Sequence, residues 1–410
     1  MGKIKDFSLS DQGNASHLWA KSHMQILASS VDRLKKSKPL KGVTLGFCLQ
    51  ITKETSVLLL GAKELGAEVV ACAGNPLTTQ DDIAAFLESS GIDVFAWSGQ
   101  TKSEYGWCQD KVLSQKPDII IDDGGDLNAK AHFGRKFQSL RIMGATEETT
   151  TGVSRYLAMQ GKGKLRYPII AVNNAKTKTM FDNKYGTGQS TIDGYLRAMN
   201  LLFASKRVVV CGYGWLGKGV ARRCAGMGSK VIVTEVDPIK ALEAHMDGFE
   251  VMPIAAAARI GDIFITCTGM TDVIQKKHML SMKSGAVVGN VGHFDVEIDS
   301  KFLLSKSKRQ VRPNLDECLL PNEKKIYLIS KGRVANLIAS EGHPPEVMAL
   351  SFSNQLHSIL YIFRNHKKMR NLVYDVPKQI DDQVAADALS SFSVQIDRLS
   401  EKQIKYHARW

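Results

Sequence analysis

The sequence lacks any apolar run that approaches the ~20 residues needed to cross a bilayer. Its first ten residues, MGKIKDFSLS, lack the apolar core of a secretion signal. Position 6 is Asp6, where an N-myristoylation motif requires Ser or Thr. We therefore expect a cytoplasmic protein without a membrane partner.

Cysteine pairs with CxxC spacing are also missing. The seven cysteines are an odd number, and most of them lie in apolar segments. This pattern indicates buried, reduced thiols and argues against a disulfide framework or a zinc site. We expect no bound metal.

The sequence shows no signature of a nucleic-acid-binding module, although its net charge is +13. The basic residues form short runs, such as 33–36, 306–309 and 366–368, without interleaved aromatic residues. Solvated surface charge is the favoured interpretation, and steering of an anionic substrate is a minor alternative. We expect no nucleic-acid partner.

The 410 residues contain 44% hydrophobic and 23% charged residues, which is typical of a globular protein with two domains. Short apolar runs alternate with helical segments, which predicts parallel sheets covered on both faces. The predicted strands lie in residues 43–49, 68–73, 93–98, 118–123, 142–146, 168–174, 207–211, 230–235, 262–269, 285–292 and 325–330.

The predicted fold class is α/β, with two doubly wound parallel-sheet domains and a C-terminal helical segment. We place a substrate-binding domain at 1–187, a nucleotide-binding domain at 188–345 and a segment at 346–410 that returns to the first domain or an oligomer interface. A turn over 184–188 should precede a helix over 190–204, with Ser190 and Asp193 as a capping box. Hinges are expected near Gly188 and in 333–348.

Polar residues follow several strands of the first domain, in 50–52, 122–126 and 146–151. Ligands of parallel sheets bind beyond the carboxyl ends of the strands, so these residues should line one cleft. Asp123 could cap the following helix, but Asp126 fits that cap better, which leaves Asp123 for chemistry.

The second domain opens with a dinucleotide-binding fingerprint. Gly212, Gly214 and Gly217 follow a strand and precede a helix, and Glu235 ends the next strand. The glycines let the backbone approach a pyrophosphate, and Glu235 can accept the ribose hydroxyls. Because a carboxylate would repel a 2′-phosphate, this Rossmann domain is predicted to bind NAD rather than NADP.

The stretch VNNAKTKTMFDNKYGTGQSTID (172–193) places Lys178 and Asp182 four residues apart, where they can share one helical face. Such a pair can polarise or deprotonate a hydroxyl in a cleft. By itself, such a pair is more often a solvated ion pair, and the accompanying motifs are what favour a functional role.

Four motifs accompany this stretch in a fixed order: IIIDDGGDL (119–127), GATEETTTGV (144–153), VVVCGYGWLGKGVA (208–221) and NVGHFDVEID (290–299). With them the chain resembles the S-adenosylhomocysteine hydrolase family over nearly its whole length. The resemblance extends to the short-tailed branch found in archaea and some bacteria. It implies NAD-dependent, reversible hydrolysis of S-adenosyl-L-homocysteine to adenosine and homocysteine.

In that family, oxidation of the 3′-hydroxyl acidifies the 4′ proton, the 5′ thiol leaves, water adds and the ketone is reduced. The resemblance implies a nucleoside thioether substrate and a homodimer or homotetramer. It assigns catalytic roles to Lys178, Asp182, Asp123, Glu148 and His293, substrate contacts to Gln50, Thr52, Glu54 and His343, and cofactor contacts to Thr149, Thr150, Thr151, Asn183, Gly212, Gly214, Gly217, Glu235 and Asn336. For proton acceptance, the pKa of Lys178 must lie well below that of a free lysine.

The chain departs from the family at Gln50, where the family has a histidine. Glutamine cannot shuttle a proton at neutral pH, so the elimination and hydration steps at the 5′ carbon are in question. The C-terminus also lacks the extension that reaches a neighbour's NAD in many family members. Two alternatives follow: the same chemistry on another 5′-substituted nucleoside, or a non-catalytic NAD-binding regulatory paralogue.

Overall fold

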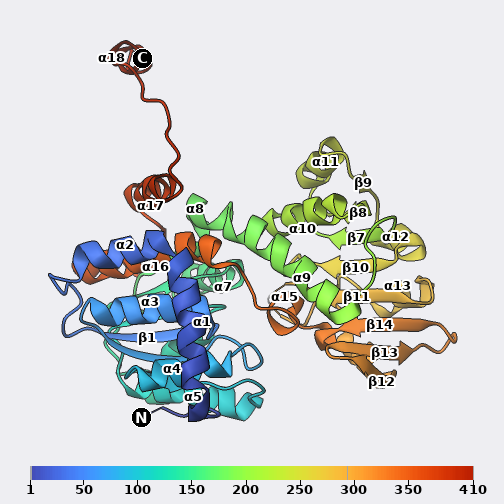
Figure 1. Ribbon diagram of the computed structural model, residues 1–410, viewed down its shortest axis with the longest axis horizontal. Helices are drawn as coiled ribbons and strands as arrows, with labels where there is room; N and C mark the ends of the chain where they lie inside the picture. The colour runs from blue at the N-terminus through green and yellow to red at the C-terminus, as the bar shows by residue number, and fades with distance from the viewer. Residues whose placement is uncertain (1, 293, 410) are drawn as a thin grey trace.

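The computed structural model describes residues 2–292 and 294–409. These residues form two α/β units, each built on one sheet with helices on both faces (Figure 1). Each sheet has a buried apolar cluster on either face, as expected of strands that are apolar throughout. The predicted α/β class is therefore confirmed.

The first sheet has seven parallel strands in the order β15-β6-β5-β4-β1-β2-β3. They are β1 (Thr44–Leu49), β2 (Glu68–Ala73), β3 (Asp93–Phe95), β4 (Ile119–Asp122), β5 (Gly144–Glu147), β6 (Ile169–Ala171) and β15 (Val373–Asp375). The last strand comes from the C-terminal part of the chain, which thus completes the edge of the first sheet.

The second sheet has eight strands in the order β12-β13-β14-β11-β10-β7-β8-β9. They are β7 (Arg207–Cys211), β8 (Lys230–Thr234), β9 (Glu250–Val251), β10 (Ile263–Thr266), β11 (Ala286–Asn290), β12 (Ser307–Arg312), β13 (Leu315–Leu319) and β14 (Lys325–Ile329). Strands β12 and β13 add an antiparallel edge that the sequence did not predict. β12 is a charged edge strand without an apolar run, which explains the omission.

Both sheets reverse their strand order next to their first strand. β1 lies between β2 and β4, and β7 lies between β8 and β10. Consecutive connections leave such a pair of strands in opposite directions, which opens a crevice beyond their carboxyl ends. The fold therefore provides two candidate binding crevices, one on each unit.

The helices vary from one turn to 21 residues. Those of the first unit are α1 (Ser10–His23), α2 (Gln25–Leu34), α3 (Lys53–Glu64), α4 (Asp81–Ser89), α5 (Lys102–Ser114), α6 (Asp126–Phe133), α7 (Thr150–Gly161), α8 (Lys176–Thr179), α16 (Pro345–Asn365) and α17 (Lys378–Ser391). The others are α9 (Thr187–Met199), α10 (Trp215–Gly226), α11 (Pro238–Met246), α12 (Ile254–Ile260), α13 (Lys276–Ser281), α14 (Ser300–Ser305), α15 (Ala335–Ile338) and α18 (Glu401–His407).

Helix α9 corrects two sequence predictions. A π-helical turn over Asp182–Gly186 replaces the predicted turn and runs directly into α9, so Ser190 lies inside the helix and caps nothing. Its hydroxyl instead donates to the carbonyl of Gly186 at 2.8 Å. The glycines serve close packing: a Cβ at Gly188 would lie 2.8 Å from the backbone of Gly219. Asn200, in a left-handed conformation, ends the helix four residues before the predicted end.

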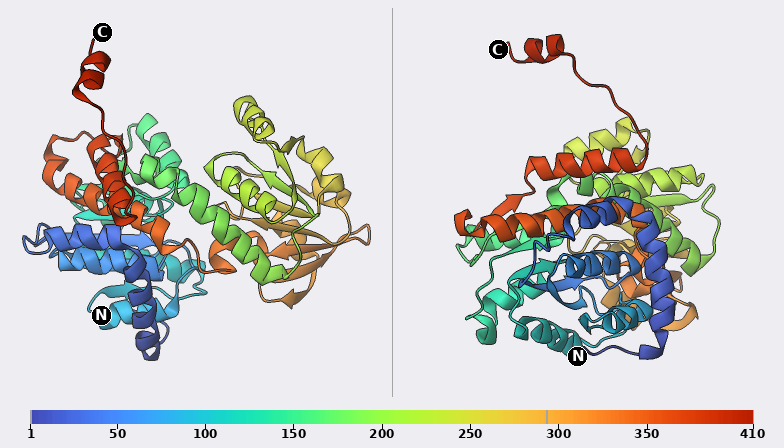
Figure 2. Two further views of the ribbon diagram at one scale, coloured as in Figure 1. Left: turned by 45° about the horizontal axis from the view of Figure 1, so that its top comes forward. Right: turned by 60° about the vertical axis from the view of Figure 1, so that its left-hand side comes forward.

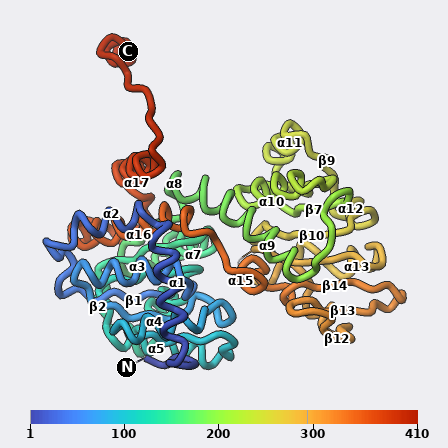
Figure 3. The backbone as a smooth tube through the Cα atoms, in the orientation of Figure 1, coloured from blue at the N-terminus to red at the C-terminus, as the bar shows by residue number. Residues whose placement is uncertain are grey.

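Two segments join the units, helix α9 and the chain around α15 (Figure 3). After α15, helix α16 packs into the first unit with most of its residues buried, and α17 packs against α16 and α2. Residues 393–400 and α18 extend away from both units (Figure 2). Every described residue from 392 onward is exposed.

The described residues contain no helix long and apolar enough to traverse a membrane. All seven cysteines are buried and unpaired, which agrees with the predicted reduced thiols.

Candidate active site between the two units

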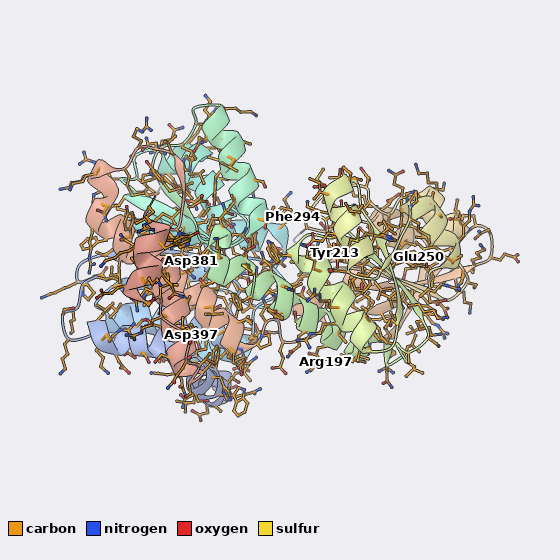
Figure 4. The ribbon with its side chains drawn as sticks, turned by 90° about the horizontal axis from the view of Figure 1, so that it is seen from above. Arg197, Tyr213, Glu250, Phe294, Asp381 and Asp397 are labelled. Atoms are coloured by element: carbon orange, nitrogen blue, oxygen red, sulfur yellow. The ribbon has the colours of Figure 1, made fainter. Side chains whose placement is uncertain are left out.

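A cavity of about 840 Å³ is lined by residues of both units, from the loops beyond the two crevices. Tyr213 and Phe294 lie on the side of the second unit that faces the first, whereas Glu250 lies on the far side (Figure 4). Thirteen residues predicted from the sequence line the cavity: Gln50, Thr52, Asp123, Glu148, Thr149, Thr150, Thr151, Lys178, Asp182, Asn183, Gly214, Asn336 and His343.

Lys178 stands at the centre of a buried polar network. Helix α8 follows strand β6 after a 3-10 turn over Val172–Asn174, and the Lys178 side chain lines the cavity, where it is 2% exposed. Its Nζ lies 2.5 Å from Oδ2 of Asp182 and 3.7 Å from Oε1 of Glu148. It also donates to Oδ1 of Asn183 at 2.8 Å. The i,i+4 pair is thus buried and not a solvated surface pair.

The charges of this network contradict the predicted titration of Lys178. Burial alone would lower its pKa, but the carboxylates of Asp182 and Glu148 outweigh burial and raise the pKa above the ordinary lysine value. Burial would raise the pKa of Asp182, but Lys178 and His343 lower it below its usual range. In this arrangement Lys178 is an ammonium and Asp182 a carboxylate.

His343 contacts Asp182. Its Nδ1 hydrogen-bonds Oδ1 of Asp182, and because a carboxylate only accepts, Nδ1 carries the proton. Its Nε2 lies 3.1 Å from the hydroxyl of Thr187 and 3.4 Å from the amide nitrogen of Asn336. His343, which was predicted to contact the substrate, therefore orients the Asp182 carboxylate in this structure.

Glu148 is held by two residues that the sequence analysis missed. Ser351 donates to its Oε1, and Gln355 donates to its Oε2 at 2.6 Å. Burial raises the pKa of Glu148, and Lys178 opposes this shift. The missed signal was a polar stripe on the apolar helix α16, where Ser351, Asn354, Gln355 and Ser358 recur at helical spacing and are fully buried.

Asp123 and Gln50 meet at the crevice of the first sheet, immediately after strands β4 and β1. The Nε2 of Gln50 donates to Oδ2 of Asp123 at 2.8 Å. The cap predicted for Asp126 belongs instead to Asp122, whose Oδ2 accepts from the backbone of Asn128 at 2.8 Å. Asp126 pairs with Arg155 at 2.7 Å. Asp123 caps no helix, as predicted, and lines the cavity.

The threonines of EETTTGV start helix α7, with Thr149 as its N-cap. Buried Glu147 accepts from the backbone N–H groups of Gly124 at 2.8 Å and Thr149 at 3.0 Å. One carboxyl group thereby fixes both the loop that carries Asp123 and the loop that carries the threonines.

The turn after β7 fits a dinucleotide. Gly212 has φ +103°, and a Cβ at Gly217 would lie 1.9 Å from the carbonyl of Gly212, so both positions require glycine. At Gly214, which lines the cavity, a Cβ would meet nothing within 4 Å. The N-terminus of α10 thus offers backbone N–H groups and room for a pyrophosphate.

The sequence analysis also missed the residue that fixes the rim of this second crevice. Glu297, from the GHFDVEID motif, accepts from the backbone of Thr268 at 2.9 Å and of Gly269 at 2.8 Å. It thereby fixes the loop after β10, which lines the cavity through Cys267, Thr268, Gly269 and Met270. The sequence signal that could have identified Glu297 was its place as an acidic residue within the motif NVGHFDVEID (290–299).

Four described residues that were predicted as contacts do not line the cavity: Glu54, Glu235, Gly212 and Gly217. Glu54 is buried behind it and pairs with Lys53 at 3.2 Å, because position 54 faces away from the helical side that carries Thr52 and Thr55. Thr52 itself caps α3 by accepting from the backbone of Thr55. Glu235 accepts from the backbone of Tyr213 at 2.7 Å, beside the glycine turn. His293 lies outside the described residues.

Comparison with known proteins gives two family matches. Residues 2–143 match the model "S-adenosyl-L-homocysteine hydrolase", and residues 183–342 match "S-adenosyl-L-homocysteine hydrolase, NAD binding domain". The second match includes Asn183, Asn336 and the glycine turn after β7. At that turn the structure has room for the pyrophosphate of a dinucleotide.

Similar proteins span the whole chain. Adenosylhomocysteinase of Sulfurisphaera tokodaii is 52% identical over 410 residues, which is 100% of this chain and 98% of that protein. Adenosylhomocysteinase of Saccharolobus solfataricus is 51% identical, again over 100% and 98%. S-inosyl-L-homocysteine hydrolase of Methanocaldococcus jannaschii is 49% identical over 100% and 99%.

Proposed function

The chain belongs to the S-adenosyl-L-homocysteine hydrolase family, and from this premise we propose that it hydrolyses S-adenosyl-L-homocysteine to adenosine and homocysteine with NAD as cofactor. The observation that carries this proposal is the buried contact of Lys178 with Asp182 and Glu148 in the cavity between the two crevices. The full-length similarity favours an enzyme over a non-catalytic regulatory protein.

When bound, NAD would accept a hydride from the 3′ carbon, which converts the 3′-hydroxyl to a ketone, and would return the hydride at the end of each turnover. We assign its pyrophosphate to Gly212, Gly214 and Gly217, and the adenosine ribose to Glu235. Thr149, Thr150, Thr151, Asn183 and Asn336 are assigned to its nicotinamide half. All of these except Gly212, Gly217 and Glu235 line the cavity.

Lys178 and Asp182 are assigned to the substrate's 3′-hydroxyl. As an ammonium, Lys178 donates to the sugar oxygen and stabilises negative charge that develops on it. To accept the hydroxyl proton, Lys178 must first release a proton and become a neutral amine, which requires that it lose part of its contact with the carboxylates. Substrate hydroxyls that bind Asp182 and Glu148 would produce that loss, since they compete for the same carboxylate oxygens.

Asp123 is assigned to the 4′ and 5′ carbons. Removal of the 4′ proton lets the C5′–S bond break, and the thiol leaves with a proton; water then adds its oxygen to C5′ and its proton to C4′. Thr52 and His343 complete the proposed substrate contacts, and the family resemblance assigns a catalytic role to His293. Residues 1–187 would hold the substrate, and residues 188–345 would hold the cofactor. Residues 346–410 would support both.

A second candidate substrate is S-inosyl-L-homocysteine, because a relative so named matches the whole chain at 49% identity. The two substrates differ only in the base, and the chemistry at the sugar is the same. We further propose a cytoplasmic homodimer or homotetramer. The exposed apolar residues of the C-terminal segment, such as Ile396, Leu399 and Ile404, support assembly.

The test measures free thiol after S-adenosyl-L-homocysteine is added to the purified protein with NAD. Wild type should release thiol, and Lys178→Met should lower the rate at least about 100-fold while it retains NAD. Lys176→Met, an exposed position on the same helix, is the matched control and should keep the wild-type rate. Thiol release only from the inosyl substrate would select the second candidate, and none from either would refute both.

A further inference from the structure

Gln50 is contacted from behind by Thr78, a residue to which neither the sequence nor the family comparison gives a role. Thr78 lies between β2 and α4, is buried and does not line the cavity. Its hydroxyl hydrogen-bonds Oε1 of Gln50, while Nε2 of the same amide donates to Asp123 at 2.8 Å.

The direction of these hydrogen bonds is determined by Asp123. A carboxylate only accepts, so the amide nitrogen of Gln50 must face Asp123 and its oxygen must face Thr78. The Thr78 hydroxyl therefore donates to that oxygen. Its alternative acceptor, the carbonyl of Asn75, is 3.3 Å away. Without the hydroxyl, the amide oxygen of Gln50 loses its hydrogen-bond donor, and among the described contacts the amide is then held only through its nitrogen, by Asp123.

The backbone leaves little freedom for another arrangement. Strands β1 and β4 are neighbours, with Cys48 paired to Asp122, so the residues that follow them are held side by side. A Cβ at Gly74 would lie 3.0 Å from Nε2 of Gln50, so the glycine makes room for the amide. Among the described contacts, Thr78 is the only donor to the amide oxygen of Gln50, so it fixes the end of the amide that Asp123 does not contact.

We propose that Thr78 is a positioning residue for the 5′ half of the reaction: it fixes the amide of Gln50 and, through it, the carboxylate of Asp123. The proposal rests on the proposed function, in which Asp123 exchanges protons with the 4′ and 5′ carbons. Gln50 then orients Asp123 but carries no proton itself. The oxidation site at Lys178 belongs to other elements and should not depend on Thr78.

The experiment compares Thr78→Val, which removes the hydroxyl at constant volume, with Thr78→Ser, which restores it. Thr79→Val is the matched control, because the Thr79 hydroxyl is equally buried and makes no hydrogen bond within the described residues. Three quantities are measured: thiol release from S-adenosyl-L-homocysteine, uptake of solvent deuterium at C4′ of added adenosine, and near-ultraviolet absorbance of reduced nicotinamide.

Thr78→Val should lower thiol release and C4′ exchange about tenfold, the loss expected for one hydrogen bond that orients a reacting group. Reduced nicotinamide should still form with adenosine, and Thr78→Ser should recover most of the rate. Equal rates for Thr78→Val and wild type, or equal losses for Thr79→Val, would overturn the proposal. So would a parallel loss of nicotinamide reduction, since this would indicate a general structural effect.

Deuterium exchange separates this proposal from the proposed function. A wild type that exchanges C4′ but releases no thiol would refute the choice of leaving group, while the Thr78 comparison still proceeds on exchange. A wild type that does neither would refute both.

Discussion

At the scale of single residues, the centre of the site is a buried charge held by other buried charges. Lys178 is an ammonium in an almost fully buried position because Asp182 and Glu148 lie beside it. Ser351, Gln355 and His343 in turn bind the carboxylate oxygens. Removing one member of such a network typically costs 3–5 kcal/mol, because it leaves an uncompensated buried charge.

His17 gives a prediction of pH-dependent stability. Its ring stacks near Phe86 and its Nδ1 contacts the hydroxyl of Ser56 at 2.8 Å. Burial, with a smaller effect of Lys21, lowers its pKa to about 4, whereas an unfolded histidine titrates near 6.5. Between these values the unfolded chain binds a proton that the folded chain does not. Stability is thus fully present above about pH 6.5 and is lost as pH falls towards 4.

The measurement is urea unfolding of wild type and His17→Gln at pH 7 and pH 4.5. The wild type should lose on the order of 2 kcal/mol more than the variant between the two pH values. An identical loss in both proteins would show that His17 does not contribute to acid sensitivity.

At the scale of elements, the short helix α8 depends on α17. Asp381 of α17 accepts from the backbone N–H groups of Lys176 at 2.7 Å and Thr177 at 2.9 Å, which are at the start of α8. A four-residue helix has little stability of its own, so a cap from another element is needed to hold it. The position of Lys178 therefore depends on a carboxylate about 200 residues away.

We predict that Asp381→Ala lowers the free energy of unfolding by about 1–2 kcal/mol, the usual cost of a lost N-cap. It should also reduce turnover, because Lys178 lies on the helix that loses its cap. Asp382→Ala removes only an exposed pair with Lys378 and serves as the control. Chemical denaturation and thiol release measure the two effects; an Asp382→Ala variant that is equally impaired would contradict this account.

At the scale of the whole molecule, the site exists only between the two units. Each sheet alone offers an open crevice, and the cavity combines the loops of both. Near the linking segments, Glu341 pairs with Lys53 of the first unit at 3.0 Å and with Arg197 of α9 at 3.5 Å. The crevices of the two units are thus held opposite one another by contacts at the connectors.

The C-terminal segment 393–410 should matter for assembly and not for the folding of one chain. Its described residues are all exposed, and they include Ile396, Leu399, Ile404 and Tyr406. Deletion of 393–410 should leave the unfolding temperature of dilute protein unchanged and reduce the mass of the oligomer in light scattering. A lower unfolding temperature without a change in mass would show that the segment packs on its own chain.

The sequence alone determined the α/β class, most strands, the dinucleotide turn and the main site motifs. These features depend on local patterns: apolar runs, glycines at fixed spacing, and motifs such as EETTTGV. It did not determine the start of α9, since glycines that seemed to form a turn serve close packing against α10. The edge strand β12 was not predicted because it has no apolar run, and it has none because most of its side chains stay exposed.

Only the tertiary structure decided how the site residues are charged and oriented. Lys178 acquires a raised pKa because Glu148, which follows strand β5, joins Asp182 beside it. Glu148 is held by Gln355, 207 residues away, and Gln50 is oriented by Thr78. Local sequence patterns do not indicate how close two segments that are remote in the chain lie in the folded protein. Burial and charge depend on that distance, so only packing could set them.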